Sequence, residues 1–145
     1  METVLGSINA LLLLSISLLH FYWIFGGKWA AEVAIPKKST GEKVFTPGTF
    51  ATFIVATGLL LLSALFVAYT GIFVLPLPHQ FLSYGVLSTA IVFTLRSIGE
   101  FRYVGFTKKV KDSEFAVMDS KYYSPLCLYL GITSLIIYLL QVPGQ

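Results

Sequence analysis

Four long apolar runs divide this chain, and they limit its fold more than any other feature of the sequence. A helix needs roughly 20 apolar residues to cross a hydrocarbon core, and each run meets or approaches that length. The sequence therefore predicts an all-α fold, an integral membrane four-helix bundle. The runs lie near Val4–Phe25, Phe50–Tyr69, Phe81–Leu95 and Leu126–Leu140.

The basic residues are confined to two stretches between these runs. All 10 Lys and Arg residues fall between Lys28 and Lys43 or between Arg96 and Lys121. Cytoplasmic loops of membrane proteins carry the excess of Lys and Arg. We therefore expect both stretches to face the cytoplasm, with the N-terminus and the C-terminus outside.

Composition bounds the size and the partners of the protein. At 145 residues, 56% hydrophobic and with a mean hydropathy of +0.80, the chain has no room for a soluble domain beside four spanning helices. We expect one transmembrane domain, residues 1–145, with helices at about 4–25, 48–70, 79–99 and 125–141. The net charge of +3 does not indicate nucleic acid, because the orientation rule and anionic headgroups already account for basic loops. The expected partner is the lipid bilayer.

Local signals mark the starts of several helices. Thr46-Pro47 and Ser124-Pro125 are each typical of an N-cap hydroxyl followed by proline at the first helical position. The segment Asp112–Asp119 predicts a short interfacial helix capped by Asp112 or Ser113. Its aromatic residues, Phe115 among them, would then touch the membrane boundary.

His20 is the histidine within a predicted span, and it shares one helical stripe with Asn9 and Trp23. Polar side chains in a bilayer tend to face the bundle interior and are functional candidates. A structural histidine that is hydrogen-bonded between helices is the alternative.

Arg96 and Glu100 lie four residues apart at the inner end of the third predicted helix, so their side chains can meet on one face. An Arg near a membrane boundary can bind a carboxylate or phosphate bidentately. A second hypothesis places Asp119 beside Arg96, and a plain surface pair is the structural alternative.

The candidate ligand-binding residues all map to the inner half of the predicted bundle. They are His20, Tyr22, Trp23, Glu32, Arg96, Glu100, Asp119 and Tyr122. This concentration favours a cytoplasmic-side polar pocket for a lipid-like or anionic small molecule, in a binding protein or a small membrane enzyme. The sequence identifies no catalytic residue and no cofactor, and no paired-His or Cys spacing indicates a metal site.

A different hypothesis makes the chain an accessory subunit of another membrane protein or a homo-oligomer. It rests on small-residue stripes that permit close helix contact. These are Thr52, Ala56 and Ser63 in the second predicted helix, and Cys127, Gly131 and Ser134 in the fourth.

Three segments resemble those of a bacterial family of small four-helix membrane proteins classed as a domain of unknown function. They are residues 20–27 (HFYWIFGG), 96–99 (RSIG) and 119–127 (DSKYYSPLC). The resemblance spans nearly the whole chain. It implies a multi-pass protein of the inner (plasma) membrane with the same four-helix layout, and it implies no activity.

Overall fold

A computed structural model describes residues 1–38, 40–72 and 76–141, and these residues fold into helices joined by loops. The long helices are α1 (Glu2–Ile24), α3 (Thr49–Tyr69), α4 (His79–Ile98) and α6 (Ser124–Gln141). Two short helices, α2 (Ala31–Ala34) and α5 (Glu114–Met118), lie in the links. A π-helical turn, η1 (Asp119–Tyr123), joins α5 directly to α6.

Four helical segments in the described part of the chain are long and apolar enough to cross a membrane, which confirms the predicted class. The fourth runs without a break from Glu114 to Leu140. Only 17 to 33% of each span is buried inside the protein. Most of the spans' apolar surface, including Leu11, Leu61 and Ile91, is therefore free to contact lipid. The chain is a multi-pass membrane protein.

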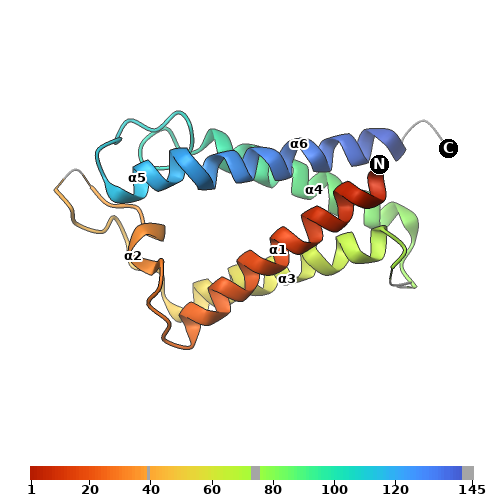
Figure 1. The fold of residues 1–145 in the computed structure, drawn as a ribbon, viewed down its shortest axis with the longest axis horizontal. Helices are drawn as coiled ribbons and strands as arrows, with labels where there is room; N and C mark the ends of the chain where they lie inside the picture. Colours follow the sequence, from red (N-terminus) through yellow and green to blue (C-terminus); the bar gives the residue numbers. More distant parts are fainter. Residues whose placement is uncertain (39, 73–75, 142–145) are drawn as a thin grey trace.

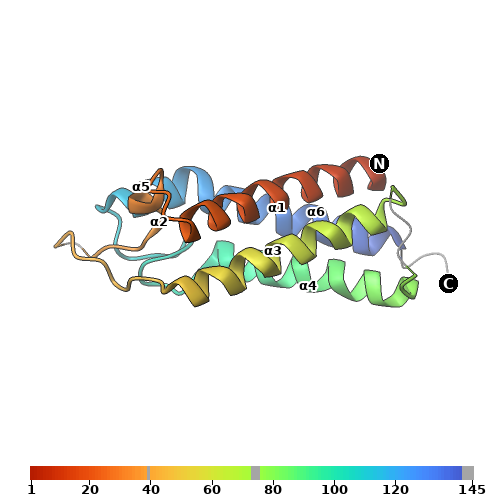
Figure 2. The same ribbon diagram turned by 90° about the horizontal axis from the view of Figure 1, so that it is seen from below.

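The long helices form two hairpins. Figures 1 and 2 show α1 running along α3, and α6 running along α4. The hairpins approach each other near the start of α1 and diverge toward the end that carries α2 and α5 (Figure 1). We call that second end, residues 25–48 and 99–123, the charged end. There, the Nζ of Lys37 lies 2.9 Å from Glu114 Oε2, so the first link reaches across to the second hairpin.

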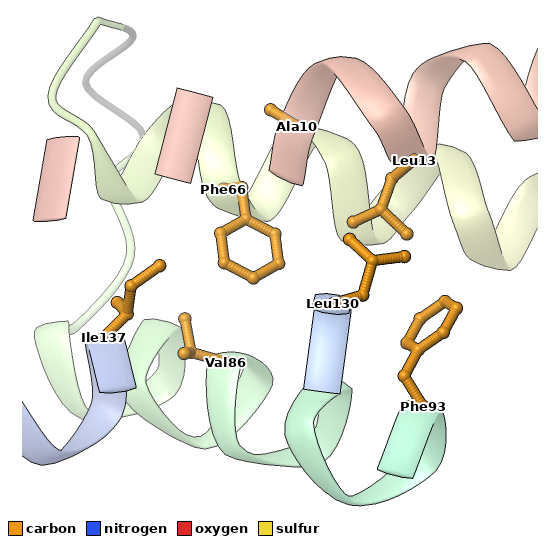
Figure 3. Packing of buried hydrophobic residues seen from close by; sticks show 7 residues of the cluster. All are labelled: Ala10, Leu13, Phe66, Val86, Phe93, Leu130 and Ile137. Carbon is orange, nitrogen blue, oxygen red and sulfur yellow. The ribbon is translucent and has the colours of Figure 1, made fainter. Parts of the chain in front are cut away.

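Apolar side chains from all four long helices meet in the centre of the bundle (Figure 3). They are Ala10, Leu13, Phe66, Val86, Phe93, Leu130 and Ile137. Asn9, on the stripe predicted to face protein, is fully buried beside this core. Its amide contacts the hydroxyls of Thr133 at 3.0 Å and Ser134 at 3.4 Å, which ties α1 to α6.

Several residues of the small-residue stripes lie inside the hairpins. Ser63 donates a hydrogen bond to the Ala10 carbonyl at 2.8 Å, and Ser17 donates to the Ala56 carbonyl at 2.7 Å, so α1 and α3 approach closely. On α6, Gly131 is buried, and a Cβ there would press on Thr94 of α4. Ala56, Ser63 and Gly131 are therefore occupied by contacts within the chain.

Both predicted hydroxyl-proline caps are wrong. Helix α3 begins at Thr49, with Gly48 as its N-cap and no side-chain cap hydrogen bond. At the other site the helix is already in progress, and the Ser124 N–H donates to the Asp119 carbonyl five residues earlier. This wider π turn accommodates Pro125, which has no N–H to give and would crowd a regular helical turn.

The short helix before α6 is confirmed, and its cap is Ser113, whose hydroxyl accepts from the Ala116 N–H at 3.1 Å. Phe115, however, is 2% exposed and packs against Tyr123 with ring centroids 6.0 Å apart. The prediction that Phe115 touches the membrane boundary is wrong, because α5 continues into a spanning helix and turns that side chain inward.

Candidate functional site

A cavity of about 420 Å³, open on one side, lies at the charged end between α1, α2 and the start of α3. Its wall is largely apolar, with side chains that include Ile24, Ala31, Ala34, Ile35, Phe45 and Val55. The polar wall residues are His20, Trp23, Thr46, Thr49 and Thr52. Of the eight residues predicted from the sequence, His20 and Trp23 line this cavity.

His20, in the wall of the cavity, uses one ring nitrogen within its own helix. Its Nδ1 lies 2.8 Å from the carbonyl oxygen of Ile16 in the same helix. Because a carbonyl only accepts, Nδ1 carries the hydrogen, and Nε2 of the neutral ring is an acceptor. Nε2 has no hydrogen-bond partner among the described residues. The structural alternative requires a hydrogen bond from His20 to another helix, whereas the observed bond is to Ile16 of the same helix.

Trp23 and Tyr22 hold the end of α1 in place. The Trp23 Nε1 donates to the Trp29 carbonyl at 2.8 Å, and its ring lies 4.9 Å from that of His20. Tyr22 is exposed, and its ring covers Gly27, where a Cβ would overlap it. Tyr22 therefore packs beside the turn after α1 and not in the cavity wall.

A second polar feature, separate from the cavity, surrounds Asp119 at the start of η1. This carboxylate is fully buried and accepts four hydrogen bonds. Oδ1 accepts from Arg96 Nη2 at 3.1 Å. Oδ2 accepts from the Gly105 N–H at 2.9 Å, Lys108 Nζ at 2.9 Å and the Ser124 hydroxyl at 3.0 Å. The arrangement satisfies a charge that would otherwise be costly to bury.

Lys108 is the second buried charge of this cluster, with 2% of its side chain exposed. Its ammonium group donates to Asp119, to the Gly105 carbonyl at 3.0 Å and to the Ser120 hydroxyl at 2.7 Å. Three acceptors match its three N–H groups. Two cations share one carboxylate, so the cluster of Arg96, Lys108 and Asp119 carries a net charge of +1.

Two glycines bring Lys108 back to Asp119. Gly99 and Gly105 both have φ of +87°, a left-handed conformation that favours glycine. A Cβ at Gly99 would overlap the Val104 carbonyl, and one at Gly105 would overlap the Ile98 carbonyl. The backbone can therefore fold directly onto the end of α4.

The predicted pairing of Arg96 with Glu100 is wrong, and the second hypothesis, which places Asp119 beside Arg96, is confirmed. Helix α4 ends at Ile98, and Gly99 turns the chain away. Because the helix has ended, Glu100 does not lie one helical turn beyond Arg96, and the four-residue spacing does not bring the two side chains together.

A family model described as "Protein of unknown function (DUF3995)" matches residues 13–134. The chain belongs to this family. The matched stretch contains all of α3, α4 and α5, and it includes His20, Asp119 and Lys108. The resemblance to a small four-helix membrane family of unknown function is thereby confirmed. No curated protein and no solved structure matches the chain.

The other predicted residues of this family member lie at the surface of the charged end. Glu100 and Tyr122 are exposed, and Tyr122 lies under the Lys121 ammonium at 5.1 Å. Glu32 is exposed, and its hydrogen bond from Lys43 at 3.0 Å lowers the pKa of the carboxyl. Within the described residues, no three His, Cys, Asp or Glu side chains are grouped in a way that could hold a metal ion.

Sequence reasoning missed three residues that donate hydrogen bonds to Asp119, namely Gly105, Lys108 and Ser124. Lys108 stands beside Lys109 in an ordinary basic pair, and no local signal separates the buried lysine from the exposed one. The pattern Ser124-Pro125 favours a helix cap instead, and Gly105 carries no side chain. Only the return of the loop onto α4 brings them together.

Proposed function

We propose that this chain binds a small amphipathic molecule in the cavity between α1, α2 and α3, at the cytoplasmic side of a bacterial inner membrane. The cavity supports this proposal because its volume is in the range of roughly 300–1,000 Å³ that small-molecule sites occupy. Such sites combine an apolar wall with a few polar groups that fix orientation. His20 Nε2 is the polar atom that carries the proposal.

The wall chemistry narrows the ligand class. Ile35, Phe45 and Val55 favour an apolar body, and the His20 Nε2 acceptor favours a hydroxyl or amine donor on the ligand. Among the described residues that line the cavity there is no Lys or Arg. Arg96, the predicted anion anchor, bonds Asp119 instead. We therefore propose an uncharged polar head in place of the anionic one.

A cavity-filling substitution tests the proposal. The wild-type chain and Ala34→Phe are purified in the same mild detergent, and native mass spectrometry measures any retained small molecule. We expect the wild type to hold one molecule per chain and Ala34→Phe to lose it, because the ring occupies the cavity. His20→Phe should weaken retention by about tenfold, which corresponds to loss of one hydrogen bond.

Ala64→Phe is the matched control, since Ala64 is an exposed residue of α3 that does not line the cavity. It should retain the molecule. Equal retention by wild type and Ala34→Phe would contradict the proposal. A stoichiometric second protein, with no small molecule, would favour the accessory-subunit alternative.

The orientation in the membrane is a separate part of the proposal, supported by the confinement of Lys and Arg to the charged end. Thr3→Cys and Gln145→Cys, each in a Cys127→Ser background, should react with an impermeant thiol reagent in intact cells. Lys111→Cys should react only after lysis. Labelling in the opposite pattern would reverse the orientation.

A further inference from the structure

The cations of the charged end fall into two groups. In the first link, Lys37, Lys38 and Lys43 each form an ion pair with a glutamate at 2.9 to 3.2 Å, whereas the exposed Lys28 has none among the described residues. The hydrogen bond to Glu114 raises the pKa of Lys37 and keeps it charged. In the second link, the exposed residues Arg102, Lys109, Lys111 and Lys121 have no ion pair among the described residues. Their charges are left for an external partner.

The backbone of the second link joins two of these residues, Arg102 and Lys109. The Arg102 carbonyl accepts from the N–H groups of both Lys109, at 3.1 Å, and Val110, at 3.0 Å. The Arg102 guanidinium lies 5.2 Å from the ring centre of Tyr103. Lys108, which lies between Arg102 and Lys109 in the sequence, turns inward to Asp119 and anchors the loop. Arg102 and Lys109 therefore stand on the outside of a loop whose shape is already fixed.

Exposed aromatic side chains flank the pair. Phe101 is 60% exposed and Phe106 is 49% exposed, although both lie in a loop with well-defined backbone hydrogen bonds. The loop follows directly on the end of a spanning helix, so it lies at the level of the membrane surface. Apolar rings can enter the boundary between headgroups and acyl chains there, while nearby cations attract anionic headgroups.

We propose that the loop of residues 99–113 is a binding site for anionic phospholipid headgroups of the surrounding bilayer. Arg102 and Lys109 contact the headgroup phosphate, and Phe101 and Phe106 insert beside it. The buried Asp119 cluster holds the loop in the required shape. This loop belongs to the hairpin of α4 and α6, and the cavity belongs to that of α1 and α3, so the two sites stand or fall separately.

Native mass spectrometry of the full chain tests this site. The protein is released from micelles that contain equal amounts of phosphatidylglycerol and phosphatidylcholine. The wild type should retain phosphatidylglycerol preferentially. Arg102→Gln with Lys109→Gln should lower that retention by about tenfold or more, because each cation near a membrane surface contributes attraction to anionic lipid. Both side chains are exposed, so the fold should persist, and an unchanged melting temperature checks this.

The control is Lys38→Gln with Lys43→Gln, which removes the same charge from the ion-paired first link. It should leave the retention within about twofold of wild type, since these cations already have partners. Equal losses in the two double variants would show that only net charge matters and would overturn the proposal. Absence of any lipid preference in the wild type would also overturn it. So would displacement of the lipid by inorganic phosphate, because that indicates a site for free phosphate.

Discussion

The Nζ of Lys108 and the Oδ2 of Asp119 lie 2.9 Å apart in a place where both side chains are withdrawn from solvent. The two residues belong to different elements, a loop after α4 and the π turn before α6. Their contact fixes the loop to the fourth span. The buried charges of this protein therefore serve its architecture.

Asp119→Asn should destabilise the protein strongly. The variant keeps the shape of the side chain but leaves the Lys108 ammonium buried without a counter-charge. Breaking one partner of a buried pair costs about 3–5 kcal/mol in free energy of unfolding. Thermal unfolding in a fixed detergent measures the loss.

Asp112→Asn is the control for this change, because Asp112 is exposed and has no ion pair among the described residues. Adding Lys108→Met to Asp119→Asn should recover part of the stability, since the buried ammonium is gone. Equal melting of wild type and Asp119→Asn would mean that the pair is not buried in the membrane-embedded protein.

Arg96→Lys should lower the free energy of unfolding by less than the loss of a bidentate contact would. Arg96 contacts Asp119 through Nη2 alone, and 35% of its side chain is exposed. Within the described residues its buried Nη1 has no hydrogen-bond partner, so lysine removes an unpaired donor as well. We expect a loss below about 1 kcal/mol for Arg96→Lys and about 1–2 kcal/mol for Arg96→Ala. Arg102→Ala, at an exposed position, serves as the comparison in the same unfolding assay. A larger loss for lysine than for alanine would contradict this account.

Gly105→Ala should disturb the loop more than Gly41→Ala, although both glycines have positive φ, +87° and +84°. A Cβ at Gly105 meets the Ile98 carbonyl, whereas one at Gly41 meets open space. The cost at Gly41 is then only that of a left-handed alanine, roughly 1–2 kcal/mol. Limited proteolysis measures the disturbance of the loop. Cleavage within residues 99–113 should rise in Gly105→Ala and stay at the wild-type level in Gly41→Ala. Equal cleavage in both variants would argue against close packing of Gly105 on α4.

Asn9→Ala should weaken the contact between the hairpins. The Asn9 amide reaches Thr133 and Ser134 of α6, and such hydrogen bonds in membranes average about 0.6 kcal/mol and reach about 1.7. The loss should appear as a lower melting temperature in detergent. Ser15→Ala, whose hydroxyl bonds only within its own helix, should melt as the wild type does. A similar loss at Ser15 would show that the effect does not come from the contact between hairpins.

The spans and the charged end follow from the sequence by itself. A bilayer sets a local requirement, about 20 apolar residues per helix, and each run of this chain meets or approaches it without help from the rest. The four apolar runs coincide with α1, α3, α4 and α6, although the fourth helical segment begins earlier, at Glu114. The confinement of Lys and Arg is also visible residue by residue. His20 and Trp23 could be singled out because a polar or amphipathic side chain in an apolar run is unusual in its own neighbourhood.

Only the tertiary structure decided which charges are buried together. Lys108 and Lys109 are indistinguishable in sequence, and Lys108 becomes part of the interior because Gly99 and Gly105 let the loop fold onto α4. In the same fold Glu100 lies away from Arg96, and Asp119 forms the ion pair with Arg96. The cavity likewise depends on α2 lying beside α1 and α3. These contacts join segments that are distant along the chain. Their energies depend on how closely the backbones approach, which no local pattern of residues predicts.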